Sequence, residues 1–83
     1  MNNKLNDKVK KCINNIEMYS QMAQNSFSRE MEDLSTAMDT KSNEDIAFYL
    51  ASQAYRKTLE SLKRREEKKL KQLQMDLVAT ILD

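Results

Sequence analysis

Residues 44–82 read EDIAFYLASQAYRKTLESLKRREEKKLKQLQMDLVATIL, and this stretch decides the fold. Its main apolar residues recur every three or four positions, or at multiples of that spacing, which places them on one face of a helix. They are Phe48, Tyr55, Leu59, Leu62, Leu70, Leu73, Leu77 and Ile81. The pattern predicts one long amphipathic helix over about residues 43–82, and the rest of the chain is expected to cover its apolar face.

The composition agrees with an all-α protein. With 83 residues the chain has room for one small domain, which we take to be residues 1–83. The sequence contains no Gly and no Pro, the residues that most tight turns require. A β-rich fold with many turns is therefore nearly excluded.

A second apolar stripe predicts another helix over about residues 5–38. Its members fall within about 120° of the helix surface when each residue turns by about 100°. They are Leu5, Val9, Cys12, Ile13, Ile16, Tyr19, Ala23, Phe27, Met31, Leu34 and Met38. The opposite side is polar, which is typical of a surface helix with one buried face.

Four polar residues at 39–42 predict the connection. Ser42 followed by Glu44 and Asp45 is typical of a helix start, because a hydroxyl and carboxylates meet unpaired N–H groups there. A loop of this length predicts a long antiparallel, coiled-coil-like hairpin, although one continuous bent helix stays open. In the hairpin, positions that add up to about 82 face each other. This pairs Leu34 with Phe48, Phe27 with Tyr55, Ala23 with Leu59, Cys12 with Leu70, Val9 with Leu73 and Leu5 with Leu77, and leaves Ile16 opposite Glu66.

The start of the second helix is apolar on two sides. Ile46, Leu50 and Ala54 form a further stripe that one partner helix cannot cover. We therefore predict self-association into a dimeric four-helix bundle or binding to a foreign helical partner. The expected interface residues are Ile46, Tyr49, Leu50, Ala54, Met18 and Met22.

Residue types that most catalytic and metal sites use are missing. The sequence has no His, which is the commonest general base and metal ligand, and no Gly for a phosphate-binding loop. Its single cysteine, Cys12, is expected on the apolar face of the first helix as a small hydrophobe. We expect no enzyme, no cofactor and no metal. The sequence shows neither a secretory signal nor an apolar run long enough to span a membrane, so we expect a soluble, cytoplasmic protein.

Charge is unevenly distributed although the formal net charge is +1. Residues 21–45 are acidic, whereas residues 1–20 and 46–83 are basic. Cations in the second helix could meet phosphates, but interleaved acids dilute their field, and an ordinary solvated surface explains them better. These cations are Arg56, Lys57, Lys63, Arg64, Lys68 and Lys71.

The residues favour a small non-enzymatic protein–protein interaction module that acts through apolar helix faces. A helical adaptor, a chaperone-like protein or a regulatory or inhibitor protein of bacterial or phage type would fit. The alternative is a protein that binds or sequesters a nucleotide or nucleic acid through the basic stretch. No family signature emerges. Short helical hairpins of this size occur among secretion co-chaperones and phage-encoded inhibitors, which is a similarity of size and architecture alone.

Overall fold

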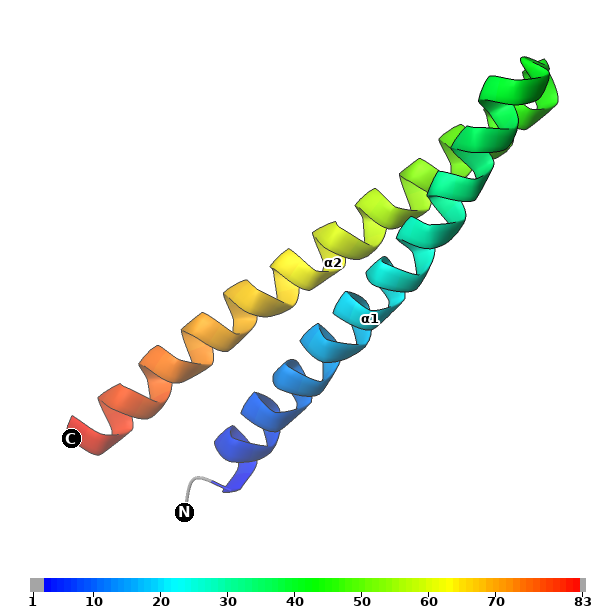
Figure 1. The fold of residues 1–83 in the computed structure, drawn as a ribbon. Helices are drawn as coiled ribbons and strands as arrows, with labels where there is room; N and C mark the ends of the chain where they lie inside the picture. Colours follow the sequence, from blue (N-terminus) through cyan, green and yellow to red (C-terminus); the bar gives the residue numbers. More distant parts are fainter. Residues whose placement is uncertain (1–2, 83) are drawn as a thin grey trace.

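The chain forms a hairpin of two antiparallel helices (Figure 1). The computed structural model describes residues 3–82, with α1 at Asn3–Thr40 and α2 at Asn43–Leu82. The helices pack against each other along a rod of 63 × 14 × 12 Å, and the two ends of the chain lie at the same end of the rod. The predicted all-α hairpin is confirmed. Neither helix, within residues 3–82, combines the length and apolar character needed to cross a membrane.

The turn at the tip of the hairpin needs only two residues. Lys41 has a φ of 53°, the left-handed conformation that ends many helices, and its N–H donates to the Ala37 carbonyl at 2.8 Å. Ser42 caps α2, since its Oγ accepts from the Asp45 N–H at 3.1 Å. The predicted cap is therefore present, and the bent continuous helix is excluded. The predicted loop over 39–42 was too long, because one left-handed residue ends α1 without glycine.

Residues that face the opposite helix follow a strict heptad spacing of alternating three and four. All of them are buried or half-buried, and we call them the contact face. In α1 they are Leu5, Val9, Cys12, Ile16, Tyr19, Ala23, Ser26, Glu30, Asp33 and Ala37; in α2 they are Asp45, Tyr49, Ser52, Arg56, Leu59, Lys63, Glu66, Leu70, Leu73 and Leu77. The rod therefore has a 3.5-residue period over its whole length.

The predicted apolar layers agree with this contact face only in the half of the rod near the chain ends. Near the turn, the prediction that Phe27, Phe48 and Tyr55 lie between the helices was wrong. Their exposed fractions are 50 %, 57 % and 52 %. An apolar stripe of period 3.6 drifts by about 20° per heptad from a 3.5-residue contact face. Over several heptads this drift moves the stripe one residue out of the interface, and polar residues take its place.

Candidate interaction surface

The interface near the turn is polar, and its centre is an ion pair between the two helices. Glu30 is only 2 % exposed. Arg56 donates to it through Nε and also through Nη2, the latter at 3.2 Å, while Arg56 Nη1 donates to Glu60 at 2.8 Å. These hydrogen bonds, from Glu30 first and then Glu60, raise the pKa of Arg56 above its ordinary value. The guanidinium also lies 5.9 Å from the ring centre of Phe27.

A second polar contact lies one turn closer to the tip of the hairpin. The Ser52 hydroxyl donates to the Asp33 carboxylate across the interface. Throughout residues 3–82, every buried side-chain nitrogen or oxygen has a hydrogen-bond partner. The polar interface is therefore fully paired, which makes it tolerable, but paired groups of this kind contribute much less stability than packed apolar side chains.

Large apolar side chains near the turn lie outside this polar interface. Six of these residues each stand one position after a contact-face residue in the sequence. Because the two helices are antiparallel, this position lies on the same side of the hairpin in both of them. We call this group the apolar flank: Phe27, Met31, Leu34, Met38, Ile46 and Leu50. Leu34 is half-buried, and the other five are between 39 % and 66 % exposed. In the half of the hairpin near the turn, polar side chains thus lie between the helices, while large apolar side chains are exposed beside them.

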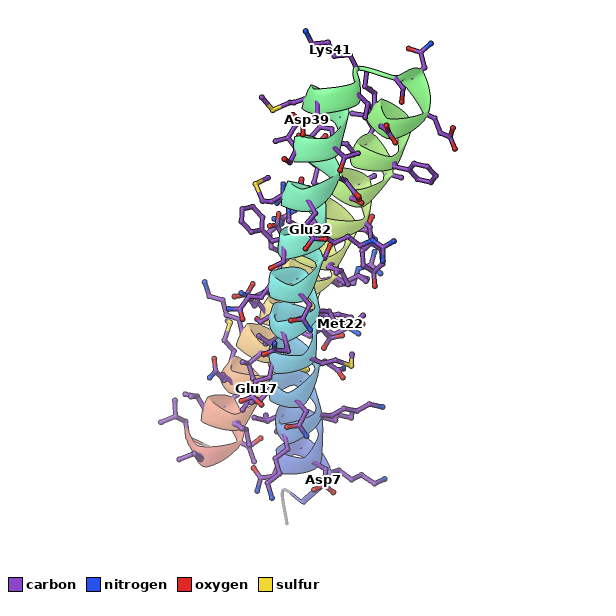
Figure 2. The ribbon with its side chains drawn as sticks, turned by 45° about the vertical axis from the view of Figure 1, so that its right-hand side comes forward. Asp7, Glu17, Met22, Glu32, Asp39 and Lys41 are labelled. Carbon is purple, nitrogen blue, oxygen red and sulfur yellow. The ribbon has the colours of Figure 1, made fainter. Side chains whose placement is uncertain are left out.

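A shallow groove runs along the opposite side of the same half. It is lined by residues that directly precede contact-face positions, including Met22, Arg29, Phe48, Ala51 and Tyr55. We call it the aromatic groove. Figure 2 shows Met22 projecting outward from α1, and its side chain is exposed. The aromatic residues that the sequence assigned to the core therefore line a surface.

The structure distributes the predicted interface residues over several surfaces. Ile46 and Leu50 belong to the apolar flank, and Met22 belongs to the aromatic groove. Met18 and Ala54 are exposed elsewhere on the rod. Tyr49 belongs to the contact face, where its hydroxyl accepts from Gln53 Nε2 at 3.4 Å. The prediction did not recognise four surface residues of the flank and placed them in the core: Phe27, Met31, Leu34 and Met38. The 3.5-residue spacing of the residues just before them could have revealed their position; those residues are Ser26, Glu30, Asp33 and Ala37.

The predicted anion-binding residues do not all lie on one surface. Arg56 is held by two carboxylates, and Lys63 is half-buried in the contact face. Arg64 donates to Ser61 at 3.1 Å and remains exposed. Apart from Arg56 and Lys63, the predicted cations lie 7, 4 and 3 residues apart along one exposed face of α2. They are Lys57, Arg64, Lys68 and Lys71.

The other half of the rod buries a thiol and a carboxylate together. Burial raises the pKa of Cys12, and its hydrogen bond with Glu66 acts in the same direction. Burial also opposes ionisation of Glu66, but hydrogen bonds from Cys12, Asn15 and Lys69 outweigh it and hold the pKa of Glu66 below its ordinary value. The pair therefore consists of a protonated thiol and a carboxylate, with Lys69 Nζ 3.5 Å from Glu66 Oε1. No group of three or more metal-ligating side chains comes together within residues 3–82.

Comparisons with protein-family models, with curated proteins and with solved structures found no match to this chain. Its surfaces are therefore interpreted from their own geometry.

Proposed function

We propose that the chain is a small non-enzymatic protein–protein interaction module that binds other helices through the apolar flank. One observation carries the proposal: near the turn, large apolar side chains are exposed, while an ion pair and a hydroxyl–carboxylate contact lie between the helices. A protein that worked alone would gain more stability from the opposite arrangement, because burial of a large apolar side chain contributes about 1.5–3 kcal/mol. Exposed apolar clusters of this kind mark surfaces that a partner covers.

The shape of the flank supports a helical partner. Its residues come from both antiparallel helices. A third helix can therefore lie along the hairpin, between the flank residues of α1, such as Met38, and those of α2, such as Leu50. Two such hairpins would give a four-helix bundle. An adaptor, a chaperone-like protein or a regulatory inhibitor would use a surface of this kind.

Replacing two apolar residues of the flank by glutamate tests the proposal. Met38 and Leu50 are its most exposed members, with 66 % and 53 % exposed, so Met38→Glu with Leu50→Glu should leave the fold intact. The matched control is Met75→Glu with Val78→Glu, which makes the same chemical change at exposed positions elsewhere on the rod. The flank variant should keep its helical circular dichroism spectrum.

The binding readout covers both kinds of partner. Wild type, flank variant and control are compared by sedimentation for self-association and by pull-down from the native host, with mass spectrometry of the captured proteins. The flank variant should lose at least tenfold in affinity for whatever the wild type binds, and the control should not. Equal binding by the flank variant and the wild type would disprove the proposal.

A second function is favoured by the exposed row of Lys57, Arg64, Lys68 and Lys71. Such a row could follow the phosphates of a nucleotide or nucleic acid, and this binding would weaken steeply with salt. Fluorescence anisotropy with a labelled single-stranded oligonucleotide at low salt would test it, with Lys57→Gln and Lys71→Gln as the weakened variant. No binding at low salt would rule the second function out.

A further inference from the structure

We infer that the apolar flank is covered by the same flank of a second copy of this chain, related by a two-fold axis that crosses the rod near Leu34. The two hairpins then run in opposite directions, and their halves near the turn form a four-helix bundle. This inference rests on the proposed function and names the partner of that surface.

The single chain exposes more surface over its whole length than a compact monomer of its mass. A compact monomer of 9.7 kDa exposes about 5,100 Å² by the usual scaling of area with mass, whereas this rod exposes 6524 Å². The difference exceeds the area of about 800 Å² that each partner contributes to a standard interface. Within the described residues, the buried apolar side chains are Cys12, Ala37 and Leu59, so the internal core is small. A second copy supplies the missing core.

The charges around the flank permit it to face itself. A two-fold contact places the same surface on both partners, so a charged surface would repel its own copy. The segment 21–45 is acidic overall, but Glu30 is paired with Arg56 inside the interface. Glu32 and Asp39 follow two positions after contact-face residues, are exposed, and lie on the face of α1 turned away from α2 (Figure 2). All six members of the flank are uncharged.

The same charges favour contact with a second copy over contact with a basic partner. A basic partner would be drawn to the outward acids of α1, such as Glu32 and Asp39, rather than to the flank. Repulsion between these acids in the dimer is screened beyond about 8 Å at physiological salt. An identical flank is uncharged as well, so it fits this surface better than a basic partner does.

The side chains beyond the flank decide the relative direction of the two rods. On the same side of the hairpin, towards the chain ends, the positions that follow contact-face residues carry both cations and acids: Lys10, Lys57, Arg64, Lys71, Glu17, Glu60 and Glu67. Two parallel rods would place each of these charges beside its own like-charged copy. Antiparallel rods that cross at Leu34 overlap only near their turns, so the halves that carry these charges point away from each other.

Sedimentation and disulfide cross-linking together test the dimer. Wild type at tens of micromolar should have twice the 9.7 kDa chain mass, and the Met38→Glu, Leu50→Glu variant should have the mass of one chain. For cross-linking, Cys12 is first replaced by Ala, and this background is checked for helical content and for the wild-type mass. Leu34→Cys, next to the axis, should then form a disulfide between subunits at least tenfold faster than Glu32→Cys on the outward face.

The outcomes separate this inference from the proposed function. A wild type with the mass of one chain overturns the dimer, whereas the proposed function stands if the flank variant still loses a foreign partner. Cross-linking of Met38→Cys as fast as Leu34→Cys overturns the antiparallel arrangement, because only parallel rods bring both positions beside their own copies. A flank variant that dimerises like the wild type overturns both.

Discussion

Leu59 is the large apolar side chain that the two helices bury most completely, with 3 % of it exposed. Its replacement by Ala removes three carbon atoms from the interface. At about 0.8 kcal/mol for each buried methylene, the lost transfer free energy is about 2.4 kcal/mol. The remaining cavity adds to this, and Leu→Ala changes in cores cost about 2–5 kcal/mol. In this narrow interface solvent and neighbouring side chains can fill part of the space, so we expect a loss of about 3 kcal/mol.

The matched comparison is Phe48→Ala. The sequence places Phe48 and Leu59 on the same helix face, but 57 % of Phe48 is exposed in the structure. Less than half of its side chain is removed from water, so its replacement should cost about 1 kcal/mol or less in the free energy of unfolding. Leu59→Met, which conserves volume, should cost less than about 1.5 kcal/mol and shows whether the position tolerates any change.

Urea unfolding followed by circular dichroism at one fixed protein concentration measures these differences. The concentration must be fixed because any self-association adds to the apparent stability. If Leu59→Ala unfolds the chain completely, Leu59→Met provides the measurable value. A Phe48→Ala variant as destabilised as Leu59→Ala would refute the reasoning, because Phe48 would then belong to the interface that the 3.6-residue stripe predicted.

Three further substitutions and one reactivity measurement test local features. Ser42→Ala should lower the free energy of unfolding by about 1 kcal/mol, measured by urea, because the Asp45 N–H loses its cap; an unchanged midpoint would contradict the capping role. Lys41→Gly should stabilise the hairpin by about 1 kcal/mol, since glycine adopts the left-handed conformation without strain, and a lower melting temperature would speak against that geometry. The lowered pKa of Glu66 stabilises the fold above the ordinary Glu pKa of about 4.3, and this contribution is lost as the pH falls through the lower folded value. Glu66→Gln should therefore flatten that part of the stability–pH curve; a curve as steep as that of the wild type would show that Glu66 is not responsible. Cys12, whose pKa burial raises, should react with a thiol reagent at pH 8 much more slowly than in urea, and equal rates would mean that the thiol is accessible.

The sequence predicted the helices well because their causes are local. The lack of Gly and Pro, the helical spacing of Leu59, Leu70 and Leu73, and the Ser42 cap all act within a few residues. The layers that pair Leu5 with Leu77, Val9 with Leu73 and Cys12 with Leu70 could also be predicted, because there the 3.5- and 3.6-residue patterns coincide. Near the turn they diverge by one position, and the larger side chains drew the prediction towards the wrong pattern.

The amino-acid sequence alone determines the two helices and the polar segment between them, because helix propensity and capping act within a few residues. Whether that segment is a turn or a bend in one helix was decided by the tertiary structure. Which side chains lie between the helices was decided by the tertiary structure. Arg56 can reach Glu30, and Ser52 can reach Asp33, only after the two helices have paired in one register. These residues are 26 and 19 positions apart in the sequence, so their pairing could not be seen in any local pattern. With these residues in the contact face, Phe27, Phe48 and Tyr55 lie one position outside it and are exposed, because a two-helix interface takes only two positions per heptad from each helix.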